Sequence, residues 1–543
     1  MSKIIKDPIY GYIKIERDDQ MAIIDCPFFQ RLRNIVQTSY VSLYPASLHN
    51  RFTHSLGVYF LGKKAGENLV AEIKNKYSDF YEENETDIIS ICETFILACL
   101  LHDVGHAPFS HTGENYFEEG DGTPSIWECL KNEISSDSFV VDSKNRTVGA
   151  PHEIMSALLS LKYLLINNNI DKELFARCII GLKYGENSTL CSIKNCFIGL
   201  LNSSTIDVDR LDYLIRDSYM SGYNNTNIDY ERLLSAISIK KVSNSFIFCF
   251  KKPALSVLEN AIIAHDAEKK WIQSNPTILL EASLVEGMIK YTINEYKNVN
   301  LSLFSLDALS EDGIGKEDWT VRLLSDIDIV SFCKKRGYHL GFINSYFDRA
   351  KRMKPVWKSE AEYKALFEKT FSTNEGGNLK LIEQYFSGFN TLMNQKFLPL
   401  INEEFKEDLE NQLKEINDAA NENELDDFTI ERKKTIEKAL TLVNKLYELC
   451  LQNNAKFEFL IVKANQFSSG FNKEEFKKIE IYFPNLDRYY SIDSVLNVLS
   501  NKTVRDKFFY IFVTDELKKK EKKLSNKIID IIIQFSRECL ENV

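Results

Sequence analysis

Glycine, proline and long apolar runs are all scarce in this sequence. Its 543 residues include only 22 Gly and 11 Pro, which excludes a collagen-like, low-complexity or disordered chain. No apolar run approaches the roughly 18 to 20 residues of a membrane helix, and MSKIIKDPIYGY at the N-terminus lacks the apolar core of a signal peptide. We therefore expect a cytoplasmic protein that makes no contact with a membrane.

Cysteine pairs and an excess of positive charge are missing too. The 11 Cys form no C-x-x-C pair and are scattered through apolar segments, so we interpret them as reduced core residues. The 67 basic residues are outnumbered by 78 acidic ones, and the net charge is -11. Because such a surface repels polyanions, nucleic acid is not expected as a partner, and any phosphate site must be a local basic pocket.

The sequence does contain a large apolar fraction with helical periodicity. Hydrophobic residues make up 44% of the chain and aromatic residues 12%, and the length corresponds to about three or four domain-sized units. Over much of residues 55–300 apolar residues recur three and four apart, as in TDIISICETFILACL, which predicts helices. A polar stretch at about 133–150 predicts an inserted loop or hairpin between two of them.

The C-terminal part of the chain has a different pattern. Charges alternate in sign along residues 401–454, which is typical of a helical hairpin with a solvated face, in the simplest case a packing arm. After residue 455 the short runs FEFLIV, KIEIYF and FFYIFVT predict strands, and an amphipathic helix ends the chain. The predicted fold is mainly α, with a helical core at 1–300, a helical extension at 301–400, the charged hairpin at 401–454 and a small α+β lobe at 455–543.

Histidines cluster near the N-terminus. Six of the 8 His precede residue 153, three of them in LLHDVGHAPFSHTGE. A lone His is usually an ordinary core or surface residue, but a cluster weighs against that interpretation. His102 and Asp103 follow an apolar helix directly, and because adjacent helical residues point about 100° apart, both can flank one metal ion. Imidazole and carboxylate ligands suit a divalent ion such as Mn, Fe, Mg, Ni or Zn.

Two further segments supply candidate metal ligands. His54 in RFTHSLGV lies 48 positions before His102, and Asp209 lies in SSTIDVDRLDYLIRDSYMSG. In the second segment Asp209, Tyr213 and Asp217 recur every four residues, which by itself is typical of a solvated helix face. Together with the histidine cluster, it favours a metal site. The predicted ligand set is His54, His102, Asp103 and Asp209.

The flanks of these residues resemble a known family. HNRFTHSLGV, LLHDVGHAPFSH and IDVDRLDYLIRDS are similar to the motifs of HD-domain metal-dependent phosphohydrolases, and in particular to the deoxynucleoside triphosphate (dNTP) triphosphohydrolases, which include bacterial dGTPases and a mammalian antiviral dNTPase. KIIKDPIYGYIKI and IIDCPFFQRLRNIVQ resemble the same branch, over about residues 1–350 in all. The resemblance implies an HD-domain helical core and hydrolysis of dNTPs to deoxynucleoside and inorganic triphosphate.

Hydrolysis at the α-phosphorus requires a metal ion and cationic groups that absorb developing charge. Arg51, three residues before His54, and Arg210, next to Asp209, are candidates to hold the phosphates. Tyr213 could donate a hydrogen bond to a phosphate oxygen.

Three histidines are candidates for acid–base chemistry, because the resemblance places them on the attack and leaving-group side: His106, His111 and His152. Glu114 follows His111 by three residues, a spacing at which a carboxylate can orient the imidazole if the segment is helical. That would favour a protonated His that acts as a general acid. Which histidine attacks stays open, and His152 follows Pro151 where a helix-start surface residue would also fit.

The resemblance also implies sites for the sugar and for an effector. It places Gln37 and Asp217 near the sugar hydroxyl, which would select deoxyribonucleotides. Nucleotide effectors in the family often bind between subunits, so we expect a homo-oligomer. The matching effector positions are Lys3, Asp25, Gln30 and Arg33. A plain Asp–Arg pair at a helix start is an equally good interpretation of Asp25 and Arg33, and Lys6 stands where the antiviral enzyme has a neutral amide.

Two other functions compete with this one. The chain could be another HD phosphohydrolase, such as a nucleotidase or a phosphodiesterase, although Arg51, Arg210 and Tyr213 favour a triphosphate over a monoester. It could also be a catalytically weak nucleotide sensor, against which the full ligand set argues. Depletion of dNTPs would serve pool balance or, in a bacterium, defence against phage, and the sequence assigns neither this role nor the preferred base.

Overall fold

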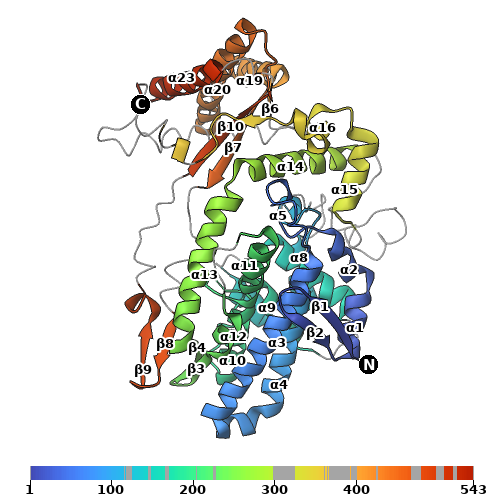
Figure 1. Ribbon diagram of the computed structural model, residues 1–543, viewed down its shortest axis with the longest axis vertical. Coiled ribbons are helices and arrows are strands. Elements are labelled where there is room, and N and C mark those ends of the chain that lie inside the picture. The colour runs from blue at the N-terminus through green and yellow to red at the C-terminus, as the bar shows by residue number, and fades with distance from the viewer. Residues whose placement is uncertain are drawn as a thin grey trace. The chain divides into compact units, whose positions relative to one another are not determined.

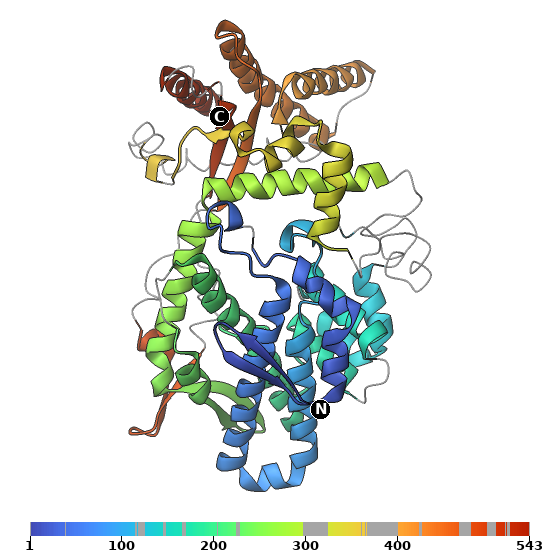
Figure 2. The same ribbon diagram turned by 45° about the vertical axis from the view of Figure 1, so that its right-hand side comes forward.

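The computed structural model describes residues 2–38, 40–114, 117, 125–144, 148–165, 170–203, 205–223, 228–296, 324–359, 361–363, 365, 392, 400–422, 426–465, 479–496, 507–515, 517 and 522–541 (Figures 1 and 2). The chain forms two compact units. The first unit comprises Met1–Glu268, Thr292–Phe332 and Ser469–Lys502, and the second comprises Lys269–Tyr291, Cys333–Ser468 and Thr503–Val543.

The first unit begins with a β-hairpin. Strands β1 (Lys3–Asp7) and β2 (Gly11–Ile15) pair antiparallel, with Lys3 opposite Ile15. Gly11 has φ +78° in the turn, a conformation that glycine adopts without strain. Alternate residues of β2 point inward, and Ile13 and Ile15 are fully buried. Helices α1 (Asp18–Asp25) and α2 (Pro27–Gln30) and the 3-10 turn η1 (Arg31–Asn34) follow.

Two long helices form the centre of this unit. They are α3 (Arg51–Lys76) and α4 (Ser78–Leu101), which lie side by side in both ribbon views. The Asn50 side chain caps α3 by accepting a hydrogen bond from the Thr53 amide. Glycine permits close packing of the two helices, because a Cβ at Gly62 would overlap Cys99 Sγ. The helices therefore hold the residues at the start of α3 and the end of α4 in a fixed relation.

Shorter helices complete the first unit. They are α5 (His111–Glu114), α6 (Ile126–Ile134), α7 (Asp137–Ser143), α8 (Pro151–Leu159), α9 (Lys172–Ile180), α10 (Thr189–Leu201), α11 (Val208–Ser221), α12 (Tyr230–Ser235), α13 (Leu255–Glu268) and α15 (Asp326–Phe332). Helix α11 packs against α3. Its N-cap is Asp207, which accepts from the Arg210 amide, and Gly222 ends it at φ +70°.

Each unit has a four-stranded sheet. In the first unit the strand order is β3 (Ile237–Val242), β4 (Ser245–Lys251), β8 (Glu480–Phe483) and β9 (Arg488–Ser491), with β4 and β8 parallel. In the second unit it is β5 (Lys354–Pro355), β10 (Lys507–Val513), β7 (Phe459–Asn465) and β6 (Leu400–Ile401). Further α-helices among the described residues are α14 (Pro276–Tyr296), α16 (Gly341–Phe347), α19 (Glu403–Glu422), α20 (Asp427–Gln452) and α23 (Lys522–Glu541).

The predicted fold class, mainly α with a strand-containing C-terminal part, is confirmed, but the predicted segment boundaries differ from the two units. The strands after residue 455 belong to two sheets, because β8 pairs with β4 of the first unit while β7 and β10 pair in the second. The predicted core at 1–300 includes Lys269–Tyr291, which belongs to the second unit. Periodicity identifies a strand but does not say which strand it pairs with.

The predicted insert at 133–150 contains a helix. Ser136 caps α7 by accepting from the Phe139 amide, and Phe139 is buried with its ring 5.5 Å from that of Trp127. One buried aromatic residue thus fixes a short helix in a segment whose polar composition predicted a loop. Residues 145–147 lie outside the described residues, as do 301–323 and most of 366–399 of the predicted extension. Residues 401–454 hold α19 and α20, which pack against each other.

No helix in the described parts of the chain is long and apolar enough to cross a membrane. The ten cysteines whose side chains the structure describes, Cys26 to Cys450, are free thiols.

Candidate metal centre and active site

Two imidazoles face each other where α3 begins and α4 ends. His54 is in the first turn of α3, and His102 is the C-cap residue of α4. Their Nε2 atoms are 3.3 Å apart. His102 Nδ1 lies 3.0 Å from the Cys99 carbonyl oxygen, so a proton on Nδ1 would donate to this carbonyl and leave the Nε2 lone pair available to a metal. Both side chains are almost completely buried.

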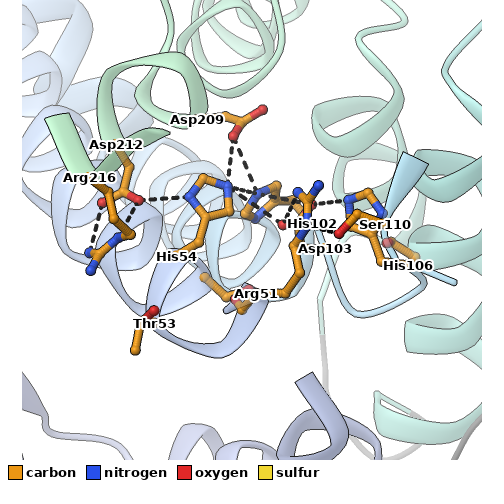
Figure 3. Close-up of polar contacts among 12 residues, drawn as sticks. Arg51, Thr53, His54, His102, Asp103, His106, Ser110, Asp209, Asp212 and Arg216 are labelled. Carbon is orange, nitrogen blue, oxygen red and sulfur yellow. Dashed lines mark hydrogen bonds and ion pairs between the residues drawn. The ribbon is translucent and has the colours of Figure 1, made fainter. Parts of the chain in front are cut away.

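Two carboxylates complete the cluster (Figure 3). Asp103 places its oxygens 3.5 Å from His54 Nε2 and 3.4 Å from His102 Nε2. Asp209 Oδ1 lies 2.9 Å and 3.7 Å from the same two atoms. Ligands at about 2.0–2.2 Å from one metal ion are about 3–3.5 Å apart, so the donor set and its spacing fit a divalent ion. The four predicted ligands are therefore brought together.

The electrostatics of this cluster favour a cation. Burial opposes a charge on His54, but Asp209, Asp212 and Asp103 outweigh it and raise its pKa to about 10. Burial also opposes a charge on Asp103, but Arg51, His102 and His106 hold the pKa of this carboxyl well below its ordinary value. The carboxylates therefore stay ionised and attract positive charge, which a protonated imidazole or a metal ion can supply.

Asp212 is a component of the site that the sequence analysis missed. Its Oδ2 lies 2.7 Å from His54 Nδ1, so it orients this imidazole from the side opposite Nε2. Arg216 donates to both Asp212 oxygens at 2.9 and 3.0 Å (Figure 3). Arg216 also donates to Asp7 at 2.9 Å. Asp212 and Arg216 are four residues apart on α11. Because this spacing is equally typical of a solvated ion pair on a helix surface, it does not by itself mark Asp212 as part of the site.

Of the predicted phosphate ligands, Arg51 lies directly at the metal cluster. Its Nη1 is 2.8 Å from Asp103 Oδ2, and its Nε donates to Ser110 Oγ at 2.9 Å. Arg210 lies on α11, where it donates to the Thr205 carbonyl. Burial raises the pKa of Tyr213 well above its ordinary value, which keeps this phenol protonated as a hydrogen-bond donor.

The predicted acid–base residues form a second cluster around one carboxylate. The Nδ1 atoms of His106, His111 and His152 lie 2.7, 3.1 and 2.9 Å from the oxygens of Glu114. The rings of His106 and His152 are stacked with centroids 4.1 Å apart. His106 Nε2 is 3.0 Å from Asp103 Oδ1, so the two clusters are adjacent. The predicted His111–Glu114 contact is present, within α5.

These three histidines differ in environment. The side chain of His111 is 68% exposed, whereas His106 is fully buried. Burial and the positive charge of Arg51 lower the pKa of His106 to about 4. Burial opposes a charge on His152 as well, but the Glu114 carboxylate outweighs it and raises the pKa of His152. The cluster thus combines a neutral imidazole with one that holds a proton readily.

The two predicted sugar-binding residues are linked by a histidine that the sequence analysis did not select. Asp217 Oδ1 is 2.7 Å from His49 Nε2, and both side chains are buried. The main-chain N–H of Gln37 donates to the main-chain carbonyl of His49 at 3.1 Å. His49 lies within HNRFTHSLGV, so the only available sequence signal was its place in that motif.

The predicted effector residues form two pairs near the start of the chain. Lys3 on β1 forms an ion pair with Asp25 at the end of α1. Gln30 donates to the Ile24 carbonyl at 2.7 Å and accepts from Arg33 Nε at 2.8 Å. The Arg33 guanidinium also lies 3.6 Å from the centre of the Phe52 ring. Lys3, Asp25 and Arg33 are at least partly exposed.

Part of this chain matches a known domain family. Residues 51–160 match the HD domain family model, so the chain contains an HD domain, a class that binds divalent metals. One relative is an uncharacterized protein of Mycoplasma pneumoniae, which is 32% identical over 48% of this chain and 53% of that protein. Another is the deoxynucleoside triphosphate triphosphohydrolase SAMHD1 of Bos taurus, which is 28% identical over 46% of this chain and 41% of that protein. The resemblance to the dNTPase branch is thereby confirmed.

The chain spans about half the length of these relatives. The fold is also found in solved structures. A phosphohydrolase from Bacteroides thetaiotaomicron aligns with 94% of this chain and 99% of its own, with a TM-score of 0.54 and 18% identity, which shows likeness of fold alone.

Proposed function

We propose that this chain is a metal-dependent hydrolase that converts dNTPs to deoxynucleoside and inorganic triphosphate. The observation that carries the proposal is the convergence of two imidazole Nε2 atoms and two carboxylates beside a buried arginine and a histidine–glutamate cluster. His54, His102, Asp103 and Asp209 would hold the metal ion. When bound, such an ion polarises a phosphoryl oxygen and lowers the pKa of water.

The residues of the chain then bind the phosphates and move protons. Arg51 is held by Asp103 and Ser110, and its Nη2 lies 3.5 Å from His111 Nε2. This position lets it neutralise charge that develops on the triphosphate between the two clusters. Arg210 and Tyr213 on α11 would bind further phosphate oxygens, as a triphosphate needs more donors than a monoester.

Glu114 holds the acid–base histidines in place. A carboxylate that accepts from Nδ1 of an imidazole favours the protonated form, which can donate from Nε2 to a leaving oxygen. His111 is the most exposed of the three, and His152 is the one whose pKa is raised. One of these two is our candidate general acid, and His106 lies between them and the metal ligands.

We further propose that Gln37 and Asp217 contact the sugar, and that the Lys3–Asp25 and Gln30–Arg33 pairs bind a nucleotide effector in a homo-oligomer. The relatives named deoxynucleoside triphosphate triphosphohydrolase support a dNTP substrate. The decisive experiment incubates the Mn-loaded protein with each dNTP, singly and mixed, and separates the products by anion exchange. Deoxynucleoside with triphosphate is the expected result, and turnover only in mixtures would indicate an effector. Monophosphate or diphosphate products would instead identify another HD phosphohydrolase.

A further inference from the structure

The loop that carries the catalytic candidates has an unusual backbone. Phe109 and Ser110, between His106 and His111, have φ +58° and +53°. Two consecutive non-glycine residues in the left-handed region are strained, and such strain persists only where the surroundings hold it. The loop also turns tightly, because a Cβ at Gly113 would overlap the Pro108 carbonyl oxygen. Something outside the loop must therefore stabilise this conformation.

A carboxylate far along the chain makes hydrogen bonds to this loop. Asp326, the first residue of α15, accepts from the Phe109 amide at 2.5 Å through Oδ1 and from the Val36 amide at 2.9 Å through Oδ2. Asp326 is buried. Ser110 donates to the Val36 carbonyl at 2.5 Å and accepts from Arg51. A single side chain thus joins the histidine loop to the segment that precedes Gln37.

A buried arginine holds the other end of the same loop. Arg31 donates to the carbonyls of Val104 at 2.8 Å and His106 at 2.7 Å. Its third bond, at 2.9 Å, reaches the Leu324 carbonyl, two residues before Asp326. Burial lowers the pKa of Arg31 to about 10, and the negative charge of Asp326 opposes this effect. Burial raises the pKa of Asp326 to about 7, against the Val36 and Phe109 amides and the charge of Arg31. The two charges thus reduce each other's cost of burial while the side chains hold two sides of the loop.

We propose that Asp326 and Arg31 are positioning residues that hold the loop of residues 104–110, and through it His106 and His111, in the reactive conformation. Both residues bind main-chain atoms of the loop rather than the side chains of the predicted metal ligands. Asp326 also lies outside the HD domain match at 51–160. The catalytic part of this inference rests on the proposed function, whereas the structural part does not.

The test compares Asp326→Asn with wild type. The carboxamide keeps one acceptor oxygen, but its NH2 group then faces an amide donor, so one of the two bonds, to the Phe109 or to the Val36 amide, is lost with little change in volume. We expect hydrogen exchange in the peptide covering 104–114 to accelerate about tenfold, and kcat for dNTPs to fall about 10- to 100-fold, with KM and bound metal unchanged. The kcat measurement is repeated with bis(p-nitrophenyl) phosphate, a phosphodiester, as a second substrate.

The matched control is Asp328→Asn, the same chemical change two residues along α15. Asp328 accepts from the Ser325 amide and hydroxyl, and its hydrogen bonds stay within 325–328. We expect exchange in 104–114 and kcat to stay at wild-type values. Arg31→Lys is the second test variant, in case Asp326→Asn fails to fold: it keeps the charge but loses the fork that reaches three carbonyls.

The outcomes are distinct. Unchanged exchange in both test variants would overturn the proposal, as would faster exchange with unchanged kcat, or a loss of bound metal that accounts for the lost turnover. If wild type hydrolysed no dNTP, the proposed function would fail, and exchange in 104–114 would still decide whether Asp326 and Arg31 hold the loop.

Discussion

Asp212 Oδ2 and His54 Nδ1 lie 2.7 Å apart, with both side chains fully buried. The contact fixes the ring so that the opposite nitrogen, Nε2, faces Asp103 and Asp209. Arg216 and Asp7 extend this contact to the N-terminal hairpin. The orientation of one predicted metal ligand is thus set by residues of β1 and α11.

Asp212→Asn should weaken metal binding. The carboxamide has only one acceptor oxygen and no negative charge to stabilise a partly positive imidazole, and changes of this kind typically lower metal affinity by about 10- to 100-fold. Metal content after dialysis against graded chelator, measured by mass spectrometry, gives the affinity. Asp229→Asn is the control, since Asn retains the cap that Asp229 provides to α12. Equal metal retention in both variants would refute the role of Asp212.

Asp209→Ala should abolish hydrolysis. The change removes one ligand and one negative charge from the metal cluster. The fold should persist, because Asp209 lies in the first turn of α11 and its side chain is 39% exposed. Circular dichroism checks the fold, and product analysis checks turnover. Tyr219→Ala on the same helix, where the ring is 56% exposed, is the control and should stay active. Turnover at the wild-type rate in Asp209→Ala would show that Asp209 is not a ligand.

Glu114→Gln should shift the pH profile of kcat. In the folded protein the Glu114 carboxylate raises the pKa of His152 against the effect of burial. Without that charge the pKa falls, to below its ordinary 6.5 if burial dominates. A general acid must be protonated, so the alkaline limb of the profile should move to lower pH. Glu153→Gln is the comparison: Glu153 is bonded to the Ala150 amide and raises the pKa of His152 less than Glu114 does, so the alkaline limb should move less in this variant. An unmoved alkaline limb in Glu114→Gln would contradict this assignment.

Gly57→Ala should destabilise the protein and weaken metal binding together. A Cβ at this position would overlap Asp212 Oδ1 and displace it from His54, and overpacking of this kind costs about 1–3 kcal/mol. Gly199 in α10 has no atom within 4 Å of an added Cβ, so Gly199→Ala should increase the free energy of unfolding by about 0.4–1 kcal/mol. Urea unfolding measures the free energy of unfolding of both variants. A Gly57→Ala protein as stable as Gly199→Ala would contradict the predicted overlap with Asp212.

Asp25→Ala should impair activation by mixed nucleotides while basal turnover and metal content stay the same. The change removes the carboxylate that pairs with Lys3, at a site that has no contact with the metal cluster among the described residues. Activity titrations with each added nucleotide provide the measurement. Asp18→Ala, at the other end of α1, is the control. An identical response in the two variants would rule out an effector site at Asp25.

Much of the site was predictable because its residues belong to compact motifs. His102 and Asp103 are adjacent at a helix end, and a repeated spacing on α11 pointed to Asp209, so local geometry and resemblance together were sufficient. The mainly α fold was predictable for the same reason, since the apolar periodicity of α4 is a local property of the sequence.

Other features depended on contacts between distant parts of the chain. Asp212 reaches His54 across 158 positions, and Asp326 reaches Phe109 across 217. The pairing of β8 with β4 likewise joins segments more than 200 residues apart. The sequence by itself determined the helices, the histidine loop and the chemical types of the ligands, because these follow from residue identity and local spacing. Only the tertiary structure decided which buried carboxylate orients which imidazole or loop, because burial and partner choice are set when distant elements pack together.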